Sequence, residues 1–402
     1  MNWHIVKLGE IAEFSNGINF DKDSYMHGIP LIGVSNFGDR FYPSYSELEE
    51  VKEEIVREKD YLQDDDIVFV RSNGNKELVG RCMLVKNPPL KITFSGFCIR
   101  CRFTDKLQYN PTFMTYYFKS TGFRRSMSGT AVGANIQNLS QGRLSSHTAR
   151  LPDYLTQCRI AEVLSAYDDL IETNRHQIKL LQEAAQRLYK EWFVDLRYPG
   201  HENVPVVDGV PEGWNKATVA SRVSLLSGYA FKSSEFESQG EYKIVTIKNV
   251  KDGEFDGSNT SRILTIPEKM PKHCNLLEGD ILLSLTGNIG RTCIVVGNGY
   301  LLNQRVAKLE SEIPAFTYCL FRSKDMYDAM NNLANGVAQQ NLSPIKTGEL
   351  LVLFPSEDVQ DEFEKTVQPI MKKMIFLQRQ NESAMQARDR LLPKLMSGEI
   401  AV

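Results

Sequence analysis

The tetrapeptide QNLS at residues 137–140 returns unchanged at residues 340–343, 203 positions further along the chain. PTF at 111–113 and PAF at 314–316 keep the same separation. Matches that keep their order along a chain are typical of an internal duplication. The sequence therefore predicts two domains of one fold, related by a pseudo-two-fold axis.

The matches continue toward the N-terminus with small changes in separation, which fall in loop-like stretches. DIV at 66–68 returns as DIL at 280–282, and the run that opens at Trp3 returns at Trp214. The dipeptide Gly-Arg ends a polar loop in each copy, at residues 80–81 and 290–291. The duplication therefore covers nearly the whole of both copies.

The 402-residue chain is too long for one compact unit. Its composition, 42% hydrophobic and 24% charged, is typical of a soluble globular protein. We expect a cytoplasmic protein, because the chain has no apolar run of about 18 residues and no signal-peptide pattern at its start. The seven cysteines are scattered, which argues against a disulfide framework.

The net charge of −3 hides a local imbalance. Residues 47–66 contain ten acidic and three basic side chains, so this segment carries −7 and the rest of the chain +4. A basic surface elsewhere is therefore permitted.

Short apolar runs cut by Gly, Asn, Asp and Pro indicate strands and turns in both copies. The expected strands lie in residues 28–34, 66–70 and 82–85 of the first copy, and in residues 242–247 and 279–285 of the second. A helix is expected over residues 111–122, with a counterpart from Pro314, because proline suits the first turn of a helix. The fold class is therefore α/β (α+β), with strands and helices mixed in each copy.

Each copy ends in a heptad pattern in which apolar residues alternate at spacings of four and three, typical of a long helix with one apolar seam. The seam positions are Ile160, Leu164, Tyr167, Ile171, Asn174, Ile178, Leu181, Leu188 and Trp192, then Phe363, Val367, Ile370, Met374, Leu377, Asn381, Leu391 and Leu395. We expect the two helices to pack against each other, with Asn174 and Asn381 fixing the register. The alternative is that each helix docks separately on its own domain.

These patterns divide the chain into four segments. We predict a first globular domain at 1–152, a long helix and linker at 153–205, a second globular domain at 206–356 and a C-terminal helix at 357–402. The Pro- and Gly-rich stretch at 204–213 has the composition of an ordered turn.

A search for catalytic motifs finds no P-loop, nucleophile elbow or zinc-protease signature. NPPL at 87–90 is similar to the Asn-Pro-Pro-aromatic motif of DNA aminomethyltransferases, but Leu90 has no ring to stack on a base. Cys98 and Cys101 form a CxxC without a second ligand pair, so no metal site is predicted. We therefore expect no catalytic centre on this chain.

The order of a globule, a long helix, a second globule and a second long helix resembles the specificity subunit of type I restriction–modification systems. The resemblance covers essentially the whole chain. Its local marks are the opening Trp-xxxx-Leu-Gly-Glu at residues 3–10, Gly-Asp-Ile-Leu at 279–282, and Asn-Leu-Ser at 138–140 and 341–343. A further mark is a Pro five residues before a Gln at 152–157 and 355–360. Thr156 and Val359 depart from the Glu that family members often have there.

The resemblance implies that each globule is a target-recognition domain that reads one half of a split site in double-stranded DNA. It also implies that the helices form an antiparallel coiled coil, which acts as a spacer and as a docking platform for two methyltransferase subunits. Those subunits bind S-adenosylmethionine, so the chain itself needs no cofactor. A restriction/translocase subunit can join the complex, and no membrane is involved.

Polar loop residues that recur in both copies are the expected DNA contacts, because Arg bonds guanine and Asn or Gln bonds adenine in the major groove. The candidates are Arg71, Asn73, Asn75, Lys76, Arg81, Asn135, Gln137 and Asn138, then Tyr229, Lys232, Thr286, Asn288, Arg291, Asn303, Gln304, Arg305, Gln339, Gln340 and Asn341. For any one of them, an ordinary role in a hairpin turn or a cap remains open.

Two other functions remain open at this point. The chain could be a structural coiled-coil scaffold without DNA binding, or a DNA-modifying enzyme whose centre carries no familiar motif. DNA affinity at low salt separates the first from the specificity function. Methyl transfer or cleavage by the isolated chain identifies the second.

Overall fold

A computed structural model describes residues 3–38, 40–72, 78–128, 138–258, 260–334 and 341–402. The chain forms two compact units, each of which contains parts of both long helices. Unit 1 consists of Met1–Leu170 and Ala384–Val402, and unit 2 consists of Ile171–Ser383. These units are defined by packing and each combines parts of both long helices, so they do not test the four segments predicted along the sequence, which stay a prediction.

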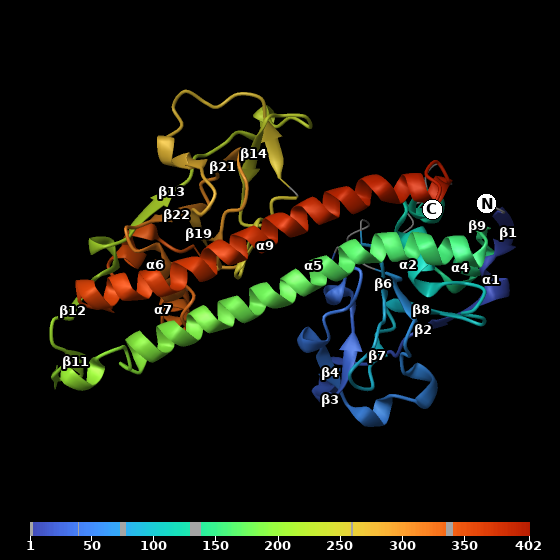
Figure 1. The fold of residues 1–402 in the computed structure, drawn as a ribbon, viewed down its shortest axis with the longest axis horizontal. Helices are drawn as coiled ribbons and strands as arrows, with labels where there is room; N and C mark the ends of the chain where they lie inside the picture. Colours follow the sequence, from blue (N-terminus) through green and yellow to red (C-terminus); the bar gives the residue numbers. More distant parts are fainter. Residues whose placement is uncertain (1–2, 39, 73–77, 129–137, 259, 335–340) are drawn as a thin grey trace. The chain divides into compact units, whose positions relative to one another are not determined.

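Unit 1 mixes short strands and helices (Figure 1). Its strands are β1 (Trp3–Lys7), β2 (Ala12–Asn16), β3 (Tyr25–Ile32), β4 (Glu49–Val51), β5 (Ile67–Val70), β6 (Cys82–Leu84), β7 (Thr93–Phe94), β8 (Cys98–Phe103) and β9 (Thr148–Pro152). Its short α-helices are α1 (Leu8–Ile11), α2 (Pro111–Lys119), α3 (Thr121–Ser128) and α4 (Gln141–Ser146).

The centre of unit 1 is a four-stranded sheet of order β2-β8-β5-β6. One face packs against α2, and the other packs against the three-stranded sheet β4-β3-β7. All four side chains of β5 are fully buried, because both faces of the central sheet are covered. Cys98 and Cys101 belong to the clusters on opposite faces, as expected for residues three apart on a strand.

Unit 2 contains the corresponding elements and a few more. Its strands are β10 (Val206–Val207), β11 (Val210–Pro211), β12 (Asn215–Thr218), β13 (Ser224–Ser227), β14 (Tyr242–Val245), β15 (Val250–Lys251), β16 (Glu254–Phe255), β17 (Ser261–Ile263), β18 (Asn275–Leu276), β19 (Ile281–Ser284), β20 (Thr292–Ile294), β21 (Tyr300–Leu302), β22 (Val306–Glu310) and β23 (Leu351–Phe354). Its short α-helices are α6 (Pro314–Phe321), α7 (Lys324–Ala334) and α8 (Pro344–Gly348).

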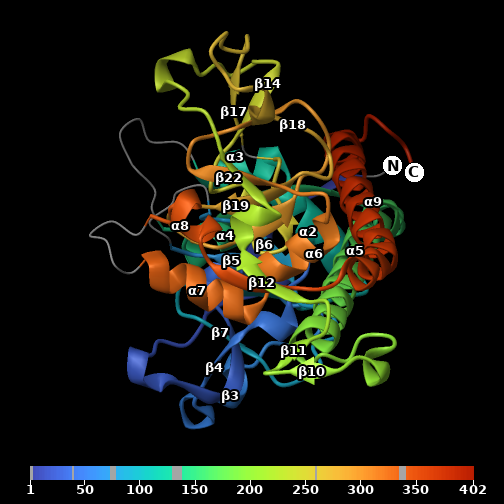
Figure 2. The same ribbon diagram turned by 90° about the vertical axis from the view of Figure 1, so that its left-hand side faces the viewer.

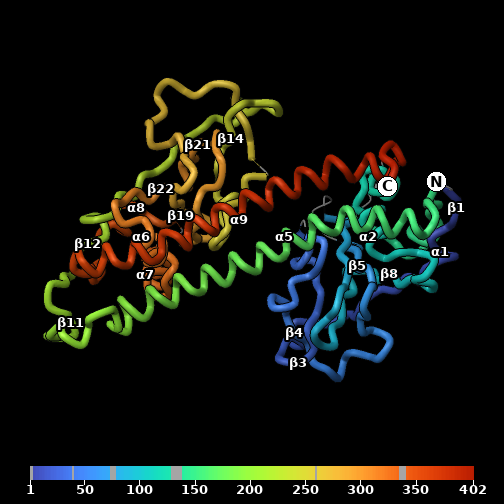
Figure 3. The backbone as a smooth tube through the Cα atoms, in the orientation of Figure 1, coloured from blue at the N-terminus to red at the C-terminus, as the bar shows by residue number. Residues whose placement is uncertain are grey.

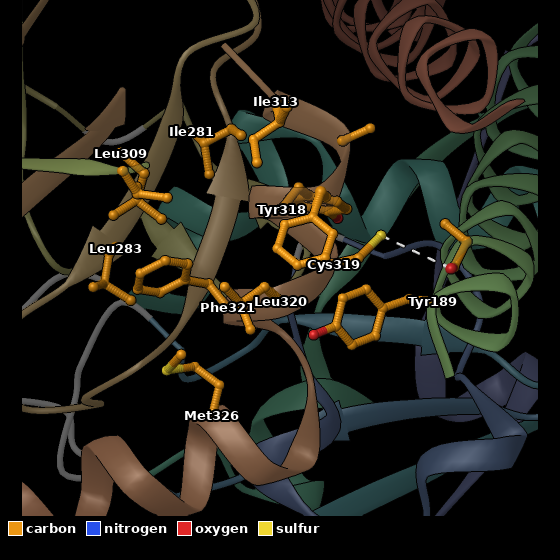
Figure 4. Packing of buried hydrophobic residues seen from close by; sticks show 14 of the residues in the cluster. Tyr189, Ile281, Leu283, Leu309, Ile313, Tyr318, Cys319, Leu320, Phe321 and Met326 are labelled. Carbon is orange, nitrogen blue, oxygen red and sulfur yellow. Dashed lines mark hydrogen bonds between the residues drawn. The ribbon is translucent and has the colours of Figure 1, made fainter. Parts of the chain in front are cut away.

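The central sheet of unit 2 has the order β13-β22-β19-β20. Helices α6 and α7 lie on one side of it, and β14, β17 and β18 lie on the other (Figure 2). Figure 4 shows the largest core cluster of this unit, in which the ring of Tyr189 lies beside Cys319 and Leu320. Cys319 Sγ donates to the carbonyl oxygen of Ala185, which ties α6 to the first long helix, α5 (Tyr154–Tyr189).

The two units share one topology. The terminal strands pair antiparallel in both, as β1 with β9 and as β12 with β23. The parallel pair β3 and β7 of unit 1 corresponds to the parallel pair β14 and β21 of unit 2. The predicted duplication of a mixed α and β fold is therefore confirmed.

The long helices are α5 (Tyr154–Tyr189), which continues as a π-helical turn at Lys190–Val194, and α9 (Glu357–Ser397). In unit 2, α9 lies alongside the second half of α5 (Figure 3). Asn174 Nδ2 donates to Asn381 Oδ1 at 2.9 Å, and the rings of Trp192 and Phe363 lie 5.5 Å apart. Early residues of one helix thus meet late residues of the other, so the two helices pair antiparallel within this unit.

Unit 1 shows the same pairing with the remaining parts of the helices. Leu395 of α9 joins the core cluster that contains Ile160 and Leu164 of α5. The predicted packing of the two helices against each other is therefore confirmed inside each unit, and separate docking is not what the structure shows.

The heptad positions lie mostly inside, and the buried face drifts by one residue at three of them. Ile160, Leu164, Ile171, Asn174, Ile178, Trp192, Phe363, Val367, Met374, Leu377, Asn381 and Leu395 are buried, and Tyr167, Leu181, Leu188, Ile370 and Leu391 are half-buried. Next to Tyr167, Leu188 and Ile370, the following residue in the chain is the more buried one. A straight helix has 3.6 residues per turn, so its inner face drifts by about 20° per heptad from a strict 3.5 repeat.

The helix expected over residues 111–122 is not continuous, and this prediction was wrong in that respect. Helix α2 ends before Ser120, whose backbone is extended, and α3 begins after it. The Ser120 hydroxyl donates to the Tyr117 carbonyl at 2.6 Å and accepts from the Phe123 amide at 3.3 Å. A serine that caps one helix and starts the next is a stable break.

The linker at 204–213 contains the hairpin β10–β11, in agreement with the predicted ordered turn. Asp208 and Gly209 between its strands both have positive φ, of 51° and 75°. Positive φ at both central residues suits a two-residue hairpin, because the twist of the turn then matches the twist of the two flanking strands.

Candidate nucleic-acid interface

One end of the central sheet in unit 1 gathers four chain segments. Because the strands are antiparallel, β2 and β5 end at the same side on which β6 and β8 begin. We call this side the loop end of each unit. It consists of residues 17–20, 71–72, 95–97 and 138–140 in unit 1, and of residues 228–231, 285–290, 303–305 and 341–343 in unit 2.

Matched backbone hydrogen bonds hold the loop ends together. In unit 1 the Arg71 amide donates to the Phe97 carbonyl at 2.8 Å, and the Leu139 amide donates to the Arg71 carbonyl at 2.8 Å. In unit 2 the Leu285 amide donates to the Arg305 carbonyl at 3.0 Å, and the Leu342 amide donates to the Leu285 carbonyl at 2.8 Å. The loops therefore share one backbone framework, whereas their side chains differ.

A glycine begins the first segment of each loop end for a steric reason. A Cβ at Gly17 would lie 2.1 Å from the Phe94 carbonyl oxygen, and one at Gly228 would lie 2.3 Å from the Asn303 carbonyl oxygen. Only glycine permits such a close approach of two backbones. The repeated Asn-Gly and Ser-Gly pairs of the sequence thus mark a packing requirement.

The repeated Asn-Leu-Ser motif divides into three roles. Leu139 and Leu342 are buried, at 2% and 1% exposure. The hydroxyls of Ser140 and Ser343 cap the short helices α4 and α8. Asn138 and Asn341 are exposed, so the asparagine is the position in this motif that can reach a partner.

The repeated Gly-Arg motif ends the hairpin loop in both units. Gly80 and Gly290 both have a φ of 79°, which favours glycine. The carbonyls of Arg81 and Arg291 accept from Val70 and Ser284 at 2.8 and 2.9 Å, which places both arginines at the first position after the loop. Both are half-buried.

In unit 1 the structure brings three predicted DNA contacts, Arg71, Arg81 and Asn138, to the loop end or directly after its hairpin loop. Arg71 is half-buried, and its Nη1 donates to the Gly96 carbonyl at 3.2 Å. Part of this guanidinium therefore holds the turn at 95–97. Asn73, Asn75, Lys76, Asn135 and Gln137 lie outside the described residues.

In unit 2, seven of the predicted contacts lie on three of the four segments or, for Arg291, directly after the hairpin loop. Asn288, Gln304, Arg305 and Asn341 are exposed, and Thr286, Arg291 and Asn303 are half-buried. Asn303 Oδ1 accepts from the Arg305 amide at 3.4 Å, so this asparagine shapes its own turn. Thr286 Oγ1 is buried and has no hydrogen-bond partner in the part of the chain that the structure describes. Gln339 and Gln340 lie outside that part.

The two weaker candidates follow Gly228, with Tyr229 on the fourth segment and Lys232 directly after it. Tyr229 is half-buried and packs edge-on against the ring of Phe231, at 5.1 Å between centroids. Its backbone bonds Leu302 and Gln304, which indicates a packing role. Lys232 is exposed, so its ammonium group can reach a phosphate of DNA.

Phe97 is a residue of the loop end that the sequence analysis did not select. It occupies the same place in unit 1 as Arg305 in unit 2, because both carbonyls accept the equivalent amide. Its side chain is 63% exposed. The two residues are separated by 208 positions, unlike any match used to align the copies, which explains why the sequence did not reveal the pair.

A buried polar cluster joins the two long helices in unit 1. The Tyr116 hydroxyl donates to Asp168 Oδ2 at 2.5 Å, and Asp168 Oδ1 forms an ion pair with Arg388. Burial, followed by the charge of Asp168, raises the pKa of Tyr116, so the phenol stays protonated as the donor. The nearby carboxylates, Asp168 first, keep Arg388 charged by raising its pKa against the effect of burial.

An apolar groove of about 450 Å³ lies along α9 in unit 2. Met371, Ile375 and Phe376 line it together with Pro314 at the start of α6. The Phe376 ring is 54% exposed, and the Lys373 ammonium lies 5.1 Å from its centroid.

The cysteines do not have the surroundings of catalytic thiols. Six of the seven are buried, and burial raises the pKa of Cys98 to about 12 and that of Cys82 to about 11. A nucleophilic cysteine needs a lowered pKa instead.

Within the described ranges, no group of three or more His, Cys, Asp and Glu side chains could hold a metal ion. Among the helices described, none has the length and apolarity to cross a membrane.

Comparison with known proteins gives consistent matches over nearly the full length. The chain is 25% identical to the MjaIX specificity subunit of Methanocaldococcus jannaschii, over 100% of this chain and 94% of that protein. It is 23% identical to the EcoKI specificity subunit of Escherichia coli, over 95% of this chain and 84% of that protein. The HindI specificity subunit of Haemophilus influenzae is 22% identical over 99% of this chain and its own full length.

A solved structure shares the fold. The type I restriction–modification S subunit from M. genitalium superposes with a TM-score of 0.57 at 17% identity, covering 98% of this chain and 96% of that one. The family model described as the type I restriction modification DNA specificity domain matches residues 1–183 and 211–383. These two matches contain both loop ends and most of both long helices. The chain therefore belongs to the type I restriction–modification DNA specificity family and carries two copies of its domain.

Proposed function

We propose that this chain is the DNA-reading subunit of a type I restriction–modification enzyme and that each unit reads one half of a bipartite site in duplex DNA. The observation that carries this proposal is the pair of matched loop ends. One backbone framework presents different side chains in the two units. Such an arrangement suits two different half-sites bound by one type of domain.

The side chains at the loop ends have the chemistry that base edges require. Arg305 and Arg291 in unit 2 and Arg71 and Arg81 in unit 1 carry donors suited to guanine O6 and N7. The exposed amides of Asn138 and Asn341 suit adenine.

In this proposal the chain recognises the DNA sequence and does not catalyse the reaction. Two methyltransferase subunits, which bind S-adenosylmethionine, and a restriction/translocase subunit complete the enzyme. Apolar side chains that remain exposed on the long helices support docking of such subunits. They are Val163 and Leu170 in unit 1, and Leu180 and Phe376 in unit 2. Exposed apolar side chains on a helix favour protein contacts.

The test is a selection of binding sites from random duplex DNA by the chain assembled with methyltransferase subunits and S-adenosylmethionine. We expect one motif in two separated parts, with an affinity that falls steeply as salt rises. A selection without enrichment would contradict the DNA-reading function and favour a structural scaffold. Methyl transfer or cleavage by the isolated chain would contradict the absence of catalysis.

A further inference from the structure

Phe97 occupies an unusual place for an aromatic side chain. At 63% it is the most exposed phenylalanine of the chain. A large apolar ring in contact with water forgoes the free energy of burial. Its backbone explains its position in the turn, since its carbonyl accepts the Arg71 amide at 2.8 Å and the Ser72 amide at 3.4 Å. Neither bond depends on the side chain, so the ring itself calls for another explanation.

The polar groups around Phe97 place the ring within the loop end. Arg71 Nη1 donates to the carbonyl of Gly96, the residue directly before it. Ser72 forms an isolated β-bridge with Asn138, which brings an exposed amide to the same side. In unit 2 the equivalent position holds Arg305, a side chain that can bond a base or a phosphate. The backbone framework thus places Phe97 and Arg305 at one and the same position in the two units.

The chemistry of a phenyl ring limits what it can recognise on DNA. It has no hydrogen-bonding group, so it cannot read the donors and acceptors of a base edge. The 5-methyl group of thymine is the one apolar group that bases present in the major groove. An exposed ring among polar readers therefore fits thymine better than any other base.

We propose that Phe97 reads a thymine in the half-site of unit 1 by contact with its 5-methyl group, at the position where unit 2 uses Arg305. This inference rests on the proposed DNA-reading function. It assigns different base classes to one structural position, an apolar contact in unit 1 and a hydrogen-bonding contact in unit 2.

The experiment uses the assembled complex and the site selected for it. Each thymine of the site is replaced by uracil, which removes only the methyl group, and the dissociation constant is measured for the wild type and for Phe97→Ala. We expect one thymine in the unit 1 half-site whose replacement weakens wild-type binding about fourfold, the effect of burying one methyl group. The same replacement has no effect on Phe97→Ala, whereas Phe97→Leu retains part of it.

Arg305→Ala is the matched control, since it alters the equivalent residue of unit 2. It leaves the response to that uracil unchanged. Failure of the wild type to select any motif overturns the DNA-reading function itself. A selected motif whose unit 1 half contains no methyl-sensitive thymine, or a uracil effect that persists in Phe97→Ala, overturns the role of Phe97 alone. A thymine that becomes unstacked on binding, measured by 2-aminopurine fluorescence at the neighbouring base, indicates insertion of the ring and also overturns the methyl contact.

Discussion

Unit 1 and unit 2 join the same pair of helices by different chemistry. In unit 1, Asp168 is 3% exposed and is held by the Tyr116 hydroxyl and the Arg388 guanidinium. Asp168 and Tyr116 are buried and the Arg388 side chain is 13% exposed, so the Asp168 charge is stable only while its partners remain in place.

In unit 2 the residues 203 positions away along the chain are all apolar or weakly polar. Cys319 and Ala185 are fully buried and Met371 is 6% exposed. The shared fold is therefore compatible with a buried ion pair or with plain apolar packing. The heptad pattern is common to both pairings, whereas the polar cluster is confined to unit 1, so we expect unit 1 to be more sensitive to single substitutions at these positions.

Loss of the arginine should have the largest effect. Arg388→Ala leaves the buried Asp168 without its cation, and we expect unit 1 to lose about 3–5 kcal/mol of its free energy of unfolding. Chemical denaturation with hydrogen exchange of α2 measures the loss. Arg390→Ala on the exposed side of the same helix is the control and should change stability by about 0.5 kcal/mol or less.

The next variant transfers the unit 2 residues to two of the three positions and removes only the hydroxyl group at the third. A triple variant with Tyr116→Phe, Asp168→Met and Arg388→Ala removes the charge as well as its partners. We expect it to recover more than half of the stability lost in Arg388→Ala, because apolar replacement of a whole ion pair is often neutral. No recovery would mean that unit 1 depends on the ion pair for its packing.

A smaller effect should be equal in the two units, because it acts on the shared framework. Gly17→Ala and Gly228→Ala each place a methyl group against a carbonyl oxygen, at 2.1 and 2.3 Å. We expect each to cost about 1–3 kcal/mol in urea denaturation. Gly142→Ala is the control, since a Cβ there meets nothing within 4 Å. A cost confined to one unit would show that the loop ends are not equivalent.

The smallest effect concerns pH. His147 in unit 1 corresponds to Leu350 in unit 2, and burial lowers the pKa of His147 below 6.5. Folding therefore favours the neutral ring, so this stability is complete above pH 6.5 and is lost as pH falls through the lowered pKa. His147→Leu should remove this acid sensitivity, measured as the shift of the urea midpoint of unit 1 between pH 7.5 and 5.5. An unchanged shift would assign the sensitivity to other groups.

Much of the architecture could be predicted from the sequence, because the repeated motifs have steric causes. Gly17 and Gly228 allow backbone contact, and Leu139 and Leu342 fill matched core positions. The heptad pattern predicted the helix pairing because an apolar stripe of this length needs a partner. A sequence motif predicts the structure well where one residue type alone satisfies the local geometry.

Other features depend on contacts between distant parts of the chain. An aspartate beside the seam, such as Asp168, is ordinarily read as a solvated side chain, and only the fold reveals Arg388 and Tyr116 around it. The equivalence of Phe97 and Arg305 follows from strand pairing, because their separation along the chain differs from that of the other matched residues. The bases read by each unit depend on side-chain direction at the loop ends, which spacing does not encode.

The proposed function assigns the two halves of one site to two equivalent loop ends. It is tested most directly by repeating the site selection with complexes that carry Arg81→Ala or Arg291→Ala, the matched arginines after the two hairpin loops. We expect each variant to lose base preference in one half only, and in different halves, at a cost of about 1–3 kcal/mol in binding. Loss in both halves from either substitution, or loss in the same half from both, would contradict the account.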